Sequence, residues 1–214
     1  MKKENLFFDL DGTIIDSSQG IFNSIKYVVD SYNLKMPDNK TLSSFIGPPL
    51  HDSFKRVFKV DFKTSDMYVS KYREYYSEKG LFEFSIYDGL LDVFKLLEKK
   101  YTLFVTTSKP THYAKLILDK ADALKYFKDV SGSFMGKPDS SKEEVVNNVI
   151  CKYSLDKNLC ALIGDTRFDG EGAKISGVDF FGVSYGFGSE EELKEYKPVK
   201  IFKTTKEISD YFLG

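Results

Sequence analysis

From about residue 85 to the end of the chain, short apolar segments alternate regularly with segments whose apolar residues recur at helical spacing. This alternation limits the possible folds most strongly, because strands separated by helices pair in parallel and the helices then cover both faces of the sheet. The sequence therefore predicts an α/β fold with a parallel-sheet core. The expected strands are 101–106, 130–134, one ending at Ile163, 179–183 and 200–202; the expected helices are 90–99, 110–121, 143–153, 169–176, 189–196 and a last one at the end of the chain.

The first apolar run, residues 5–10, reads as another buried strand. It must join the same sheet, since a lone strand buries nothing. Between residues 17 and 84 the pattern is helical, and no convincing strand interrupts it. The helices expected there run from 17 or 18 to about 33, from 50 to 58, and from 65 to about 79. We therefore expect an α/β core of residues 1–16 and 85–214, interrupted by an all-helical insertion over 17–84.

The charges nearly cancel, with 31 basic and 32 acidic residues and a net charge of −1. A duplex-DNA binder or a polybasic membrane anchor needs a clustered excess of Lys and Arg, so neither class is expected. No stretch approaches the ~20 apolar residues that cross a bilayer, and Asp9 and Asp11 break the first apolar run before a signal sequence could complete. We expect a cytoplasmic protein without nucleic-acid or membrane partners; its oligomeric state stays open.

Two acids follow the first predicted strand. Asp9 and Asp11 stand two apart, so in an extended chain they point to the same side. Neighbouring carboxylates repel each other, and a cation or a shared proton must offset that repulsion. A solvated turn would also contain Asp and Gly, so this motif alone does not decide the function.

A second pair of acids follows the strand that ends at Ile163. Asp165 comes directly after Gly164, and Asp169 lies near the start of a helix, where it could also serve as a plain N-cap. Ligands of open parallel sheets bind at the carboxyl ends of the strands. Four carboxylates converging there would form an oxygen-rich pocket that suits a hard divalent cation, and Mg²⁺ fits best.

Two further features favour phosphate. Thr107 and Ser108 follow a strand and precede the helix expected at Pro110, and hydroxyls and free amides at a helix N-terminus suit an anion. A lysine is also needed, and both Lys137 and Lys142 are candidates. Lys142 is favoured because a cation in a first helical turn opposes the helix dipole unless it reaches an anion.

Together, the motifs Asp9-x-Asp11-Gly-Thr, Thr107, a lysine and Gly-Asp165-x-x-x-Asp169 resemble the four motifs of the haloacid dehalogenase superfamily, in the same order. The helical insertion resembles the cap of its phosphoglycolate-phosphatase-like branch. Within it, Gly47 belongs to a segment similar to that branch's substrate-facing loop, and Arg73 lies where cap residues approach substrate. Residues 141–146 resemble a subgroup whose lysine enters the helix, whereas Lys137-Pro138 matches the more general motif.

The resemblance implies a magnesium-dependent phosphatase acting on a small phosphorylated metabolite through a phosphorylated Asp9. Asp11 would then be the general acid and base, and Thr107 and Lys142 would contact the phosphoryl group, with Ser108, Gly47 and Arg73 binding substrate. Asp9, Asp11 (through its backbone carbonyl) and Asp165 would hold the metal, supported by Asp169. A dehalogenase would not need Asp11. A sugar-phosphate mutase, a phospho-aspartate receiver and an idle binding protein remain as alternatives, and the physiological substrate stays open.

Overall fold

The computed structural model describes residues 3–133 and 140–214, and Lys137 lies outside these ranges. The described chain forms two compact units. One comprises Met1–Asp16 with Ile86–Gly214, and the other comprises Ser17–Ser85.

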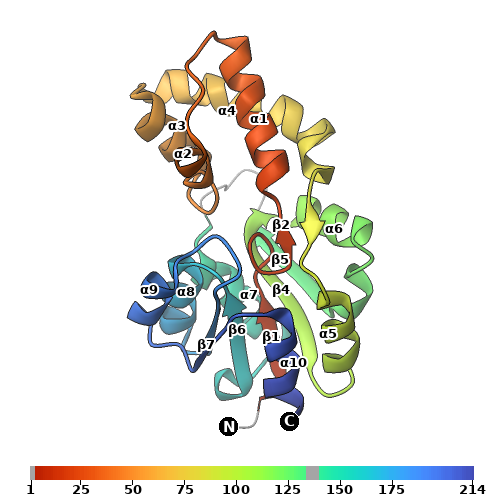
Figure 1. The fold of residues 1–214 in the computed structure, drawn as a ribbon. Coiled ribbons are helices and arrows are strands. Elements are labelled where there is room, and N and C mark those ends of the chain that lie inside the picture. The colour runs from red at the N-terminus through yellow and green to blue at the C-terminus, as the bar shows by residue number, and fades with distance from the viewer. Residues whose placement is uncertain (1–2, 134–139) are drawn as a thin grey trace. The chain divides into compact units, whose positions relative to one another are not determined.

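The larger unit is built on a six-stranded sheet in the order β5-β4-β1-β6-β7-β8, and every neighbouring pair is parallel (Figure 1). This confirms the predicted fold class. The first strand lies inside the sheet between β4 and β6, as expected for a segment that cannot bury its side chains alone. The strands are β1 (Asn5–Phe8), β4 (Thr102–Pro110), β5 (Asp129–Ser133), β6 (Cys160–Gly164), β7 (Asp179–Val183) and β8 (Lys200–Phe202).

Helices cover both faces of this sheet because successive side chains of each strand point to opposite sides. Phe7 packs on one face in a cluster with Val149 and Ala173, while Phe8 meets Phe94 on the other, with 5.2 Å between ring centroids. The helices are α5 (Leu90–Leu97), α6 (Thr111–Lys120), α7 (Lys142–Tyr153), α8 (Arg167–Ser176), α9 (Glu190–Glu195) and α10 (Thr205–Leu213), with the 3₁₀ turns η2 (Leu124–Tyr126) and η3 (Lys157–Leu159).

The smaller unit is helical and packs around aromatic side chains. Phe54 is fully buried and meets Phe45, Tyr68 and Tyr72 edge to face. Its elements are α1 (Ser18–Ser31), α2 (Asn39–Ser43), α3 (Leu50–Phe58), α4 (Phe62–Glu78) and η1 (Gly80–Phe82); a two-stranded sheet of β2 (Ile15–Asp16) and β3 (Ser85–Ile86) stands where the chain passes between the units.

Two helix starts in this unit depend on caps that the apolar spacing does not reveal. Asp61 accepts a hydrogen bond from the Thr64 amide at 2.8 Å, so α4 starts three residues before the expected Ser65. Asp38 caps the short helix α2 in the same way through Thr41. Within the described residues, no helix combines the length and apolar character needed to span a membrane.

Candidate active site

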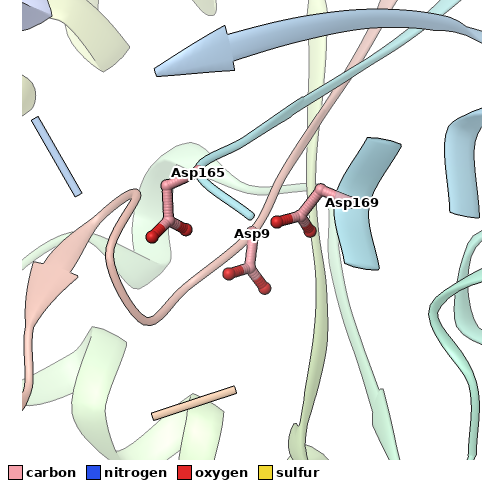
Figure 2. Close-up of side chains that lie close together, drawn as sticks. All are labelled: Asp9, Asp165 and Asp169. Atoms are coloured by element: carbon pink, nitrogen blue, oxygen red, sulfur yellow. The ribbon is translucent and has the colours of Figure 1, made fainter. Parts of the chain in front are cut away.

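Three carboxylates meet at the carboxyl edge of the sheet. Asp9 follows β1 and Asp165 follows β6, and these neighbouring strands are in register with Phe8 opposite Ile163. Asp169 reaches the same place from the first turn of α8. Ligand oxygens of the three acids lie within 4.8 Å of one another, and all three residues are buried. Figure 2 shows the three carboxylates close together.

Lys142 lies inside this cluster. It is the first residue of α7 and only 6% exposed. Its Nζ is 2.5 Å from Oδ1 of Asp9 and 2.9 Å from Oδ1 of Asp169, and it also donates to the backbone carbonyl of Thr106 at 3.0 Å. A lysine in a first helical turn, unfavourable by itself, therefore reaches two anions. The competing candidate, Lys137, lies outside the described residues.

Both carboxylate oxygens of Asp169 have polar partners that hold its side chain in place. Thr166, not Asp169, occupies the N-cap position of α8, so the reading of Asp169 as a plain N-cap is wrong. The Thr166 amide and hydroxyl donate to Oδ2 of Asp169 at 3.1 and 2.9 Å, and Oδ1 faces Lys142. The helix start thus orients this carboxylate toward the lysine.

Asp165 is held by two donors from separate parts of the chain. The Thr13 hydroxyl donates to Oδ1 at 3.1 Å, and the Phe187 amide donates to Oδ2 at 2.8 Å. A Cβ on Gly186 would stand 2.5 Å from that same Oδ2, so only glycine lets the loop after β7 approach so closely. This loop is not among the predicted site segments; its alternating glycines, Gly186 and Gly188, are the sequence signal that could have indicated it.

The cluster is short of positive charge. Among the described residues, three carboxylates against the ammonium of Lys142 leave a formal charge of −2. Burial, with Asp169 and Asp11 adding to it and Lys142 opposing it, raises the pKa of Asp9 to about 7. Burial and the charges of Asp169 and Asp9 also hold the pKa of Asp165 well above its usual range. Burial opposes the charge on Lys142, but Asp169 and Asp9 outweigh it and raise the lysine pKa. Because these buried carboxylate oxygens carry two negative charges that no neighbouring cation balances among the described residues, the cluster suits a hard divalent cation.

Asp11 is oriented differently from these three acids. Its Oδ1 lies 3.1 Å from Nζ of Lys109, and its side chain is 20% exposed. The cluster of three carboxylates does not include it. The two aspartates of the first motif therefore face different partners, although they are separated by only one residue.

The segment that carries Thr107 and Ser108 corrects one expectation. The strand was expected to end at 106 and a helix to start at Pro110, but β4 runs through Pro110 and α6 begins at Thr111. The pairing of β4 with β5 shifts register between Thr106 and Pro110, which keeps the chain extended. Thr107 is buried and Ser108 exposed, so these hydroxyls lie on a strand and not at a helix N-terminus.

Gly47 and Arg73 belong to the helical unit, and both are exposed. Their contacts with substrate stay predictions.

A cavity of about 780 Å³ lies elsewhere on the larger unit, among residues near the amino ends of the strands, such as Lys3, Thr102 and Asp179. In open parallel sheets the ligand crevice is at the carboxyl ends, where the three carboxylates and Lys142 lie. The cluster is therefore the better candidate for chemistry than this cavity.

The family described as haloacid dehalogenase-like hydrolase matches residues 6–183, which is most of the chain and contains all four motifs. The chain therefore belongs to this family. The resemblance stated from the motifs is confirmed, and so is the prediction of an enzyme of haloacid dehalogenase phosphatase type.

Three relatives illustrate the similarity. A 5'-nucleotidase from Pseudomonas aeruginosa is 35% identical over 199 residues, covering 92% of this chain and 90% of the relative. A haloacid dehalogenase-like family hydrolase from Streptococcus pneumoniae has a structure with a TM-score of 0.93 and 32% identity over 98% of both chains. The structure of a predicted phosphatase from Clostridium acetobutylicum has a TM-score of 0.92 and 34% sequence identity, covering 100% of this chain and 99% of that one.

Proposed function

We propose that this chain is a Mg²⁺-dependent phosphomonoester hydrolase that acts on a small phosphorylated metabolite through a phosphorylated Asp9. The observation that carries the proposal is the buried Asp9 carboxylate, held by Lys142 within a carboxylate cluster that lacks two positive charges. A buried, oriented carboxylate can act as a nucleophile, and the charge deficit suits a divalent cation.

In the first step a carboxylate oxygen of Asp9 bonds to phosphorus, and the bond from phosphorus to the ester oxygen breaks. Asp11 gives its proton to the leaving oxygen, so the alcohol departs neutral. Lys142 offsets negative charge on the phosphoryl oxygens as it builds up. Thr107 donates a hydrogen bond to one of them; its Oγ1 accepts from the Lys109 amide at 3.1 Å, which leaves the hydroxyl proton for the substrate.

In the second step water attacks the phosphorus of phosphorylated Asp9. Asp11, now ionised, takes a proton from that water, and the bond between phosphorus and the Asp9 oxygen breaks. Phosphate leaves and both aspartates return to their starting states. Splitting hydrolysis into two displacements lets one acid serve as proton donor and then as acceptor.

The residues proposed to hold Mg²⁺ are Asp9, Asp165 and the backbone carbonyl of Asp11. Bound Mg²⁺ would supply the positive charge that the cluster lacks and offset charge on the transferred phosphoryl group. Asp169 is proposed to support the site without binding the ion directly, because Thr166 and Lys142 already engage its two oxygens.

A panel of phosphorylated metabolites tests this function. Phosphoglycolate, sugar phosphates and nucleoside 5'-monophosphates are each incubated with the protein in Mg²⁺ and in EDTA, and released phosphate is measured. We expect release from at least one compound in Mg²⁺, a loss of at least about 100-fold in EDTA, and a higher melting temperature in Mg²⁺. Folded, Mg²⁺-stabilised protein that releases no phosphate would contradict the assignment and favour a mutase or a phospho-aspartate receiver.

Gly172 provides a second prediction, because it lies on α8 against the catalytic lysine. A Cβ at Gly172 would stand 2.4 Å from Cγ of Lys142. Gly172→Ala should displace the lysine and lower kcat by about 10- to 100-fold, since catalysis is sensitive to shifts of about 1 Å.

Gly170→Ala is the matched control for this variant. It lies on the same helix and creates a similar clash, with Cγ of Tyr196 at 2.5 Å, but does not touch the lysine. Melting temperatures and phosphate release are measured for both. Equal losses of activity per folded molecule would show that the effect of Gly172→Ala does not act through Lys142.

A further inference from the structure

Lys109 is a second lysine beside the proposed reaction centre, and the sequence motifs did not assign it a role. It stands near the end of β4, two residues after Thr107. Its side chain is 9% exposed, and its Nζ lies 3.1 Å from Oδ1 of Asp11. A lysine is seldom buried to this extent unless it is paired, and the contact with Asp11 provides such a pairing.

Asp11 depends on this contact more than an exposed carboxylate would depend on an ion pair. Oδ1 of Asp11 is buried and accepts no well-aligned hydrogen bond within the described residues. The charge of Lys109 therefore compensates this oxygen for the water it has lost. Without Lys109, the carboxylate would gain by turning toward solvent or toward another cation.

The backbone of Lys109 is fixed on both sides. Its amide donates to Oγ1 of Thr107 at 3.1 Å. On β5, Gly132 lies so close that a Cβ there would stand 2.2 Å from the Lys109 carbonyl oxygen, and the Gly132 amide donates to the Thr111 hydroxyl at 3.0 Å. Lys109 therefore lies in a strand segment, at the register shift between β4 and β5, whose backbone is in close contact on both sides.

The two lysines engage three of the four acids, and among the described residues no acid is shared between them. Lys142 engages Asp9 and Asp169, whereas Lys109 engages Asp11, which is not part of the carboxylate cluster. A carboxylate that transfers protons to and from the reacting oxygens must stay clear of the cluster's own partners.

We infer that Lys109 is a positioning residue that holds the Asp11 carboxylate apart from the cluster, in the orientation needed for proton transfer to the leaving group. This inference rests on the proposed function of Asp11. Lys109 acts through Asp11 and does not itself touch the reacting atoms.

The test uses two substrates that differ in their need for a proton donor. The oxygen of p-nitrophenyl phosphate leaves without protonation, whereas an alkyl phosphate from the panel needs the acid. The first turnover of each reports phosphorylation of Asp9 and is followed by rapid mixing in Mg²⁺. The variants are Lys109→Met, Lys109→Arg and, for comparison, Asp11→Asn.

We expect Lys109→Met to slow the first turnover of the alkyl ester by about 100-fold, within the range of general-acid effects. The first release of nitrophenolate should stay within about threefold of the original rate, and later turnovers should be slow because Asp11 is also the base. Asp11→Asn should show the same pattern, and Lys109→Arg should recover part of the alkyl-ester rate. The ratio of the two first-turnover rates is unaffected by any loss of folded protein.

Equal slowing of both substrates in Lys109→Met would overturn the inference, because the lysine would then act on the phosphoryl group or on the fold. The inference would also be overturned if Lys109→Met left the first-turnover rates of both substrates, and so their ratio, unchanged. If Asp11→Asn itself lacked the substrate difference, the acid role of Asp11 would fail and the role of Lys109 with it. If Asp11→Asn showed the substrate difference and Lys109→Met did not, the proposed function would stand and the inference about Lys109 alone would fail.

Discussion

Asp9→Asn is expected to lower phosphate release by on the order of 10⁴-fold or more, because asparagine keeps the shape of the side chain but is not a nucleophile. The variant should still fold, since its carbonyl oxygen can accept the hydrogen bond that Lys142 gives to Asp9. Steady-state phosphate release in Mg²⁺, with the preferred substrate of the panel, measures the loss.

The same variant should be more stable than the original protein in EDTA at pH 8. The pKa of Asp9 is raised from 3.8 to about 7, chiefly by burial, so the fold disfavours its ionised form. The contribution of Asp9 to the free energy of unfolding is fully present below about pH 4, and it is lost as the pH rises through about 7. Asparagine carries no such loss. Melting temperatures in EDTA should therefore differ most at pH 8 and converge near pH 4.

Two results would contradict the role assigned to Asp9. Substantial metal-dependent release by Asp9→Asn would show that another group attacks phosphorus. A variant less stable than the original at pH 8 would show that the charge of Asp9 supports the metal-free fold and does not strain it.

The sheet could be predicted from the sequence because most of its strands are apolar and are separated by helices of clear periodicity. The expected bounds of β7 and β8 agree with the structure. Where the prediction failed, a local polar contact or a tertiary pairing decided the outcome. Asp61 caps α4, so that helix starts earlier than the apolar spacing predicts. Pairing with β5 keeps β4 extended as far as Pro110, where proline would favour the start of a helix.

The candidate site was predictable as a set of residues, because the carboxyl ends of β1 and β6 must meet when the two strands pair. Which partner each acid takes could not be predicted, since lysine side chains are long and their targets depend on packing. The sequence does not show that Lys109 faces Asp11, or that Gly172 gives Lys142 room to enter the cluster. The roles of Thr107, Ser108, Gly47 and Arg73 stay predictions.

Lys142→Met should lower phosphate release by on the order of 10³-fold, the effect of removing one group that stabilises charge on the reacting oxygens. It should also destabilise the metal-free protein by about 3–5 kcal/mol, because buried carboxylates lose their charged partner. Lys142 contacts both Asp9 and Asp169, so both are left unpaired. Phosphate release in Mg²⁺ and denaturant unfolding in EDTA measure the two effects.

Lys152→Met is the matched control, since Lys152 lies on the same helix and pairs with Asp129 at 2.7 Å, but its side chain is 61% exposed. An exposed pair contributes less than about 1 kcal/mol, so this variant should keep both its stability and its activity. Losses as large as those of Lys142→Met would show that the methionine change disturbs α7 itself.

A double variant separates the structural effect of Lys142 from its chemical one. Adding Asp169→Asn to Lys142→Met removes one of the unpaired charges, so part of the stability should return while phosphate release stays low. Recovery of both would mean that Lys142 serves only as a counter-ion. If Lys142→Met kept its activity and Lys137→Met lost it, Lys137 would be the lysine that meets the phosphoryl group. Lys142 would then act by keeping Asp9 and Asp169 together in the buried cluster.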